Sequence, residues 1–237
     1  MYDAKIKKEQ NDHEKHRNQL IRDMIYVCCL PDLSEKSRRE FINVSVAWSF
    51  SDRSENDIEK KAKFKGCPYW SAKALKRIDD AGNWKKGGKK DKELRHEHVV
   101  PRSVFVNAME EHFKSVRDEI EKKKDEREEI LKREYEMLRA KMENCIFGCV
   151  VTKEEAKDID KEYKTNMPEE AYQGNEKPDK DALWDLFDKI ERPWKRYKMA
   201  GVKEVWKLEW KFEKGRWRTN KNDKKEVDLE QTIPKGK

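Results

Sequence analysis

Two histidines and a glutamate stand together in residues 95–102, RHEHVVPR. The surrounding residues, 94–100, are predicted to form a short strand that ends at Pro101. Alternate side chains of a strand point to the same face, so His96 and His98 are expected on one face and Glu97 on the other, unless the strand ends or bulges there. Two imidazoles and a carboxylate this close suit a metal site, or a general base beside one. The alternative is a surface strand that merely collects three polar residues.

Residues 97–102, EHVVPR, carry a family resemblance. They resemble the acidic residue, histidine, two aliphatic residues and proline that open the motif of HNH (ββα-metal) endonucleases, including the version in RNA-guided CRISPR effector nucleases. The resemblance implies that His98 is the general base that activates water and that Glu97 binds the metal. His96, as a second histidine beside the motif, is a further candidate ligand.

The HNH fold requires a second strand and a helix after the motif. Residues 145–151 are rich in β-branched side chains and fit the strand, and residues 153–163 fit the helix. Thr152 and Glu155 have the spacing of a capping box, which predicts that this helix begins at residue 153. The resemblance implies a metal ligand from the helix, for which Glu155 and Asp158 are the candidates. The family's asparagine and final histidine have no counterpart at the usual spacing, because Asn107 and His112 lie within or before an inserted segment.

This chemistry would cut phosphodiesters. A neutral His98 can take a proton from water, and a hard cation can neutralise the charge that develops on the leaving oxygen. The family pattern implies Mg²⁺, while a second histidine such as His96 would favour Mn²⁺, Ni²⁺ or Zn²⁺. We expect the nucleic-acid backbone to be gripped by basic side chains near the motif and by an aromatic pair that could stack a base. These candidates are Arg95, Arg102, Lys89, Lys90, Tyr69 and Trp70.

Both groups of binding candidates have a structural alternative. Lysines in the Gly-rich loop 83–91 could be a solvated charged loop. Tyr69 and Trp70 precede a predicted helix, 71–81, and aromatics in that position more often anchor a helix start in the core.

Most of the remaining chain is predicted to be helical. Residues 20–30 have apolar side chains at helical spacing and stop at Pro31, and a second helix begins near Asp32 or Ser34. A long charged arm, 107–144, repeats apolar residues every eleven positions and is either one long helix or two with a bend within 121–129. An apolar stripe on a charged helix must pack against something, so the arm is a candidate homodimer surface, and the alternative is that it folds back on its own domain.

The C-terminal region combines a helix and a strand. A helix is predicted within 181–199, ended or kinked by Pro193. Residues 202–217 alternate aromatic or aliphatic with charged side chains, which predicts an amphipathic strand in a β-hairpin.

The composition limits the partners. The chain has 237 residues, of which 44% are charged and 35% hydrophobic, and a net charge of +7 mildly favours polyanions over acidic proteins. No apolar run is long enough to span a membrane and the N-terminus is polar, so we expect a cytoplasmic protein with no membrane partner. The five cysteines form no Cys-x-x-Cys pair and are expected to be thiols, mostly buried.

Together these patterns predict a mainly helical α+β protein. It would have an N-terminal helical region, 1–93, a ββα-metal core, 94–163, interrupted by the arm at about 107–144, and a C-terminal helix and β-hairpin region, 164–237. The predicted function is a metal-dependent endonuclease acting on DNA, with RNA also open, in a restriction or phage-defence setting by family analogy. The alternatives are a non-catalytic nucleic-acid-binding or scaffold protein and a hydrolase of small phosphate esters.

Overall fold

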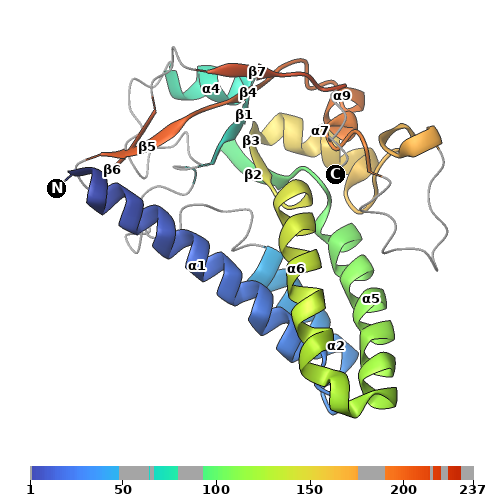
Figure 1. Ribbon diagram of the computed structural model, residues 1–237. Coiled ribbons are helices and arrows are strands. Elements are labelled where there is room, and N and C mark those ends of the chain that lie inside the picture. Colours follow the sequence, from blue (N-terminus) through green and yellow to red (C-terminus); the bar gives the residue numbers. More distant parts are fainter. Residues whose placement is uncertain are drawn as a thin grey trace. The chain divides into compact units, whose positions relative to one another are not determined.

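The fold is α+β and mainly helical, as a computed structural model of the chain shows (Figure 1). The structure describes residues 2–47, 64, 67–79, 93–175, 190–213, 216–219 and 224–230. The chain divides into two compact units. One contains the N-terminal helices and the arm, and the other contains the sheet with its helices. The arm therefore groups with the N-terminal helices, a different division from the three consecutive regions expected.

The first unit is built from helices. Its elements are α1 (Tyr2–Cys28), α2 (Glu35–Glu40), the π-helix η1 (Phe41–Ala47), α5 (Arg102–Lys122), the short 3₁₀ turn η3 (Lys124–Glu126) and α6 (Arg127–Cys145). The helix predicted before Pro31 is present as the last part of α1, which buries Ile21, Met24 and Ile25. Ser34 caps α2 by accepting a hydrogen bond from the Ser37 N–H, as its type and position predict.

The arm is two helices rather than one. Helix α5 ends at Lys122 and α6 begins at Arg127, so the bend lies inside the segment where charged side chains interrupt the apolar rows. Ion pairs join the two helices and the turn: Arg133 with Glu119 at 2.7 Å, and Lys123 with Glu126 at 3.4 Å. The segment turns because it offers no apolar side chains to bury along a continuous stripe.

The second unit contains a five-stranded sheet in the order β2-β3-β1-β4-β7. The strands are β1 (Tyr69–Ser71), β2 (Leu94–His98), β3 (Gly148–Thr152), β4 (Val205–Lys207) and β7 (Lys225–Val227). Only β1 and β3 pair in parallel, and the other three pairs are antiparallel. A separate hairpin of β5 (Trp210–Glu213) and β6 (Arg216–Thr219) confirms the predicted C-terminal hairpin. The single strand predicted from the alternation is divided into β4 and β5.

Short helices flank the sheet. They are α4 (Ala72–Asp79), α7 (Lys153–Tyr163), the 3₁₀ turns η4 (Glu169–Ala171) and η5 (Gln173–Asn175), and α9 (Lys195–Met199). The predicted bounds of α7 are correct at both ends. The basic loop 83–91 with Lys89 and Lys90, and most of the helix predicted from residue 181, lie outside the described residues.

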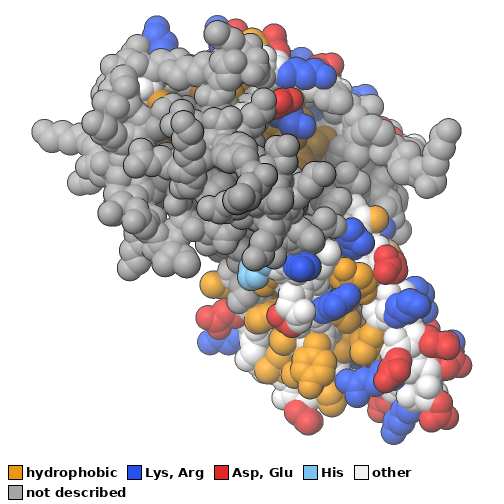
Figure 2. Space-filling model, turned by 60° about the vertical axis from the view of Figure 1, so that its left-hand side comes forward, with side chains coloured by type: hydrophobic (Ala, Val, Ile, Leu, Met, Phe, Trp, Pro, Cys, Tyr) orange, Lys and Arg blue, Asp and Glu red, His pale blue; other side chains and the backbone are white. Residues whose placement is uncertain are grey.

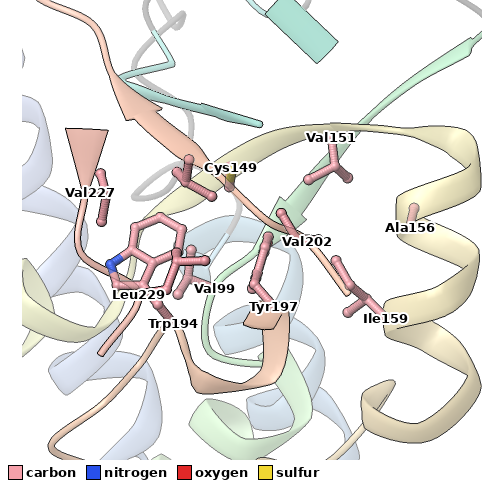
Figure 3. Packing of buried hydrophobic residues seen from close by; sticks show 11 residues of the cluster. Val99, Cys149, Val151, Ala156, Ile159, Trp194, Tyr197, Val202, Val227 and Leu229 are labelled. Carbon is pink, nitrogen blue, oxygen red and sulfur yellow. The ribbon is translucent and has the colours of Figure 1, made fainter. Parts of the chain in front are cut away.

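Two apolar clusters lie on opposite faces of this sheet. On the face that we call the α7 face, Cys149 and Val151 of β3 pack against Ala156 and Ile159 of α7 (Figure 3). Trp194, Tyr197, Val202, Val205, Val227, Leu229 and Val99 complete that cluster. On the α4 face, Trp70, Leu94 and Val150 pack against Ala74 and Leu75. Because strand side chains alternate between faces, the two clusters assign every residue of β2 and β3 to a face.

Glu155 joins the start of α7 to the neighbouring strand. The Thr152 hydroxyl accepts from the Glu155 N–H at 3.2 Å, while Oε2 of Glu155 accepts from the Thr152 N–H at 2.9 Å, which confirms the capping box. The same Oε2 accepts from the Ser71 hydroxyl at 2.6 Å, and Ser71 and Glu155 are both buried. This carboxylate therefore fixes where α7 begins relative to β1 and β3.

On the face shown in Figure 2, hydrophobic side chains gather in one area of the described surface between Lys, Arg, Asp and Glu side chains. Tyr26 and Val44, both in the first unit, are more than half exposed. None of the described helices is both long and apolar enough to cross a membrane. A homodimer through the arm stays a prediction.

We expect Glu155→Ala to destabilise the protein more than Thr152→Ala. Loss of the Thr152 side-chain cap costs about 1 kcal/mol of unfolding free energy. Removal of the Glu155 carboxylate leaves two buried donors unpaired, the Ser71 hydroxyl and the Thr152 N–H, at about 1–3 kcal/mol each. Denaturant unfolding followed by circular dichroism measures the difference. Glu155→Gln, which keeps an acceptor oxygen, should retain most of the stability, and Asp158→Ala on the exposed side of α7 is the matched control. Equal losses for Thr152→Ala and Glu155→Ala would contradict the structural role given to Glu155.

Candidate functional site

The two histidines lie side by side on the α4 face of β2. In the antiparallel register, His96 is opposite Val150 and His98 is opposite Gly148. Their ring centroids are 5.5 Å apart and the rings are nearly perpendicular, at 79°. His98, the last residue of the strand, is 8% exposed, and His96 is partly buried. The strand therefore brings together the two imidazoles that the spacing predicts on one face.

Gly148 makes room for the His96 ring. A Cβ atom added at Gly148 would lie 1.9 Å from Nε2 and 2.3 Å from Cε1 of His96, far inside van der Waals contact. Glycine is usually unfavourable inside a strand, and its presence here agrees with the close approach of a side chain. The His96 ring thus packs directly against the β3 backbone at Gly148.

Glu97 points to the α7 face, away from both histidines. Its Oε2 lies 3.8 Å from Nη2 of Arg196, whose side chain is almost completely buried. Arg196 also donates through Nη1 to the Tyr163 carbonyl at the end of α7, at 2.9 Å. The Tyr197 hydroxyl donates to the backbone carbonyl of Glu97 at 3.4 Å. Helix α9 thereby holds both the side chain and the backbone of Glu97.

The buried groups around Glu97 stay protonated. Burial raises the pKa of the Cys149 thiol well above its usual range, and the neighbouring carboxylates of Glu155 and Glu97 raise it further. Burial likewise raises the pKa of the Tyr197 hydroxyl. Burial thus favours the protonated form of both side chains.

The two predicted ligands on α7 do not join the histidines. Glu155 is buried on the α7 face, where its Oε2 accepts the two hydrogen bonds from Ser71 and Thr152. Asp158 is exposed on the outer side of the same helix. The sheet separates both carboxylates from His96 and His98, because α7 packs on Cys149 and Val151.

The histidine pair fits a divalent cation only in part. Two imidazoles that bind one ion through nitrogens about 2.1 Å away have centroids roughly 5 Å apart, close to the 5.5 Å observed. No group of three or more histidine, cysteine or acidic side chains suited to an ion is present among the described residues. The pair thus supplies one or two ligands, and the carboxylates expected to complete the set lie elsewhere.

The predicted nucleic-acid contacts are distributed over different environments. Trp70 is fully buried and donates through Nε1 to the Cys67 carbonyl at 2.8 Å, so it belongs to the core and no base can stack on it. Tyr69 is partly buried against Trp194, with ring centroids 5.0 Å apart, and the Lys207 ammonium lies 5.9 Å from its ring centroid. Arg95 and Arg102 are partly exposed.

Asn107 and His112, the residues considered for the missing family positions, have structural partners in the first unit. Asn107 accepts a hydrogen bond from Arg39. His112 Nε2 lies 2.5 Å from the buried Glu134 carboxylate.

Three residues that shape the site, Gly148, Arg196 and Tyr197, are not among the sequence predictions. Gly148 carried a usable signal, because a glycine inside a predicted strand often marks the close approach of another group. Arg196 and Tyr197 lie about a hundred residues from Glu97, and nothing local in the sequence signals that contact. Comparisons of the chain with family models, curated proteins and solved structures found no match.

We expect Gly148→Ala to destabilise the protein by about 1–3 kcal/mol, because the added methyl group overlaps the His96 ring. The cost should fall sharply in a His96→Ala background, where the overlapping ring is absent. A double-mutant cycle of unfolding free energies measures this coupling. The same cost in both backgrounds would show that His96 does not rest on Gly148.

Proposed function

We propose that the protein is a metal-dependent endonuclease that hydrolyses phosphodiester bonds of DNA, with His98 as the general base. The observation that carries the proposal is the pair of imidazoles of His96 and His98, held side by side at the end of a strand. A general base needs a second group that orients water or binds the ion beside it, and His96 stands in that position.

The order of elements supports the family resemblance. Strand β2 pairs with β3 in antiparallel fashion, and α7 follows β3 directly through the capping residue Thr152. This is the strand, strand and helix order of a ββα-metal core, with the arm inserted between the two strands. The five-stranded sheet and the cover provided by α9 are additions to that minimal unit.

The proposed mechanism uses His98 to take the proton from the attacking water. The pairing of β2 with β3 limits the orientations open to the His98 side chain, and His96 beside it would supply a nitrogen ligand to a bound ion. A bound Mg²⁺ or Mn²⁺ ion would neutralise charge on the phosphate and the leaving oxygen. Arg95, one position before His96, pairs with Val151 and so lies on the α7 face, away from the histidine pair.

Glu97, Glu155 and Asp158 stay predictions as metal ligands. Glu97 and Glu155 have protein partners on the α7 face, and those contacts would have to change before either carboxylate reached an ion beside the histidines. The restriction or phage-defence role, action on RNA and a cytoplasmic location stay predictions too.

A non-catalytic nucleic-acid-binding protein is the second candidate. It is favoured by one observation, that the buried carboxylates stabilise the fold on the face opposite the histidine pair. Such a protein would bind DNA through its basic residues, and its DNA affinity would not change when either histidine is replaced.

We expect the purified chain to nick or linearise supercoiled plasmid with Mg²⁺ or Mn²⁺ and to be inactive in EDTA. His98→Ala should lower the rate by about 10²–10⁴-fold, the usual contribution of a general base. His96→Ala should shift the metal concentration needed for half-maximal rate. His16→Ala, at an exposed position of α1, is the matched control.

Circular dichroism and thermal unfolding of each variant separate lost chemistry from lost folding, and His98→Gln is a second variant should His98→Ala unfold. Cleavage unchanged in a folded His98 variant would refute the role of this residue. Absence of cleavage by the wild-type chain with either metal, on plasmid and single-stranded DNA alike, would move the binding-protein alternative to first place.

A further inference from the structure

A basic hollow lies where α4 faces the start of α7. Its volume is about 360 Å³, and it is lined by Lys73, Lys76 and Arg77 of α4 and by Thr152 and Glu154. The three basic side chains are exposed and follow one another on the outer side of α4, whose inner side buries Ala74 and Leu75. The hollow is therefore open to a ligand from solvent.

Positive charge exceeds negative charge in this hollow. Arg77 Nη1 pairs with Glu93 at 2.6 Å. Within the described part of the chain, neither Lys73 nor Lys76 has a carboxylate within 4.0 Å. The pKa of Glu154 is lowered, chiefly by a hydrogen bond from its own backbone N–H and also by Arg77, so it stays ionised. The two lysines, without a close carboxylate partner among the described residues, thus leave the hollow basic, although Glu154 offsets part of their charge.

The hollow and the histidine pair share one face of the sheet. Thr152 is opposite Leu94, Gly148 is opposite His98, and all four lie on the α4 face. Thr152 lies four positions along the strand from Gly148, which is about 13 Å at 3.3 Å per residue. A DNA strand carries a phosphate roughly every 3.4 Å of helix axis, and its winding backbone is longer than this rise, so the distance spans at most about four nucleotides.

We propose that the basic hollow binds a backbone phosphate of the DNA strand within about four nucleotides of the phosphodiester beside His98. The inference rests on the proposed function, since it places the scissile phosphate at the histidine pair. Lysine ammonium groups bind phosphate as point charges, and the hydroxyl of Thr152, the buried polar residue in the lining, already accepts a hydrogen bond from the Glu155 N–H. The interaction positions the strand and carries no sequence preference.

The test is the salt dependence of DNA binding by the full-length chain. Fluorescence anisotropy with a labelled duplex, in EDTA so that cleavage cannot contribute, gives Kd over a range of KCl concentrations. Lys73→Gln/Lys76→Gln should weaken binding and reduce the slope of log Kd against log salt by about 1, because one neutralised phosphate contributes about 0.9 to that slope. Lys157→Gln/Lys161→Gln, at exposed positions of α7, removes the same charge from the other face and should leave the slope nearly unchanged.

The outcomes separate this proposal from the proposed function. An unchanged slope for the Lys73/Lys76 variant, an equal change in both double variants, or no DNA binding by the wild-type chain would overturn the phosphate site. Cleavage is scored separately with plasmid and Mg²⁺. A selective change of slope without any cleavage would keep the hollow as a DNA-binding site while rejecting the nuclease.

Discussion

The antiparallel pairing of β2 with β3 is the interaction on which the site depends. Its register places His96 and His98 opposite Val150 and Gly148, and the two-residue repeat of a strand then sends Glu97 to the other face. A slip by one residue would exchange the faces, moving both imidazoles toward the cluster around Tyr197 and removing Leu94 from the cluster on the α4 face. The hydrophobic cost of that exchange keeps the two histidines on the α4 face.

The two faces of the sheet have different roles. On the α7 face, the Arg196 guanidinium, the Tyr197 hydroxyl and the Ser71 hydroxyl contact Glu97 or Glu155, and together they attach α9, α7 and β1 to the strand pair. Buried polar groups of this kind are stable only when their partners are in place, so this face is suited to rigidity rather than to exchanging ligands. The α4 face carries the histidine pair and the basic hollow, and it is where the proposed DNA contacts lie.

The arm separates β2 from β3 in sequence without preventing their pairing. Closing a longer loop adds little cost, since the entropy grows only with the logarithm of its length, and a folded insertion such as α5 and α6 reduces the cost further. The arm has its own buried contacts in the first unit: Glu110 accepts from Arg38 at 3.1 Å and from Arg117 at 3.2 Å, and His112 lies against Glu134. The insertion is therefore stabilised by its own unit, and the strand pair needs only its two ends.

Local signals in the sequence determined much of the fold. The capping box gave both the start of α7 and the role of Thr152, the alternation around His96 predicted the shared face, and the interrupted apolar rows located the bend between α5 and α6. For Trp70 the sequence left a core position and a stacking role open, and the structure shows the core position. Tertiary structure alone decided which ring lies against Gly148 and that Glu97 and Glu155 turn toward α9 and β1 instead of joining the histidines. The physical reason is the sequence distance over which each interaction acts. Helix caps and apolar periodicity involve residues a few positions apart, whereas the face that a helix covers depends on contacts between distant segments, such as that of Tyr197 with Glu97.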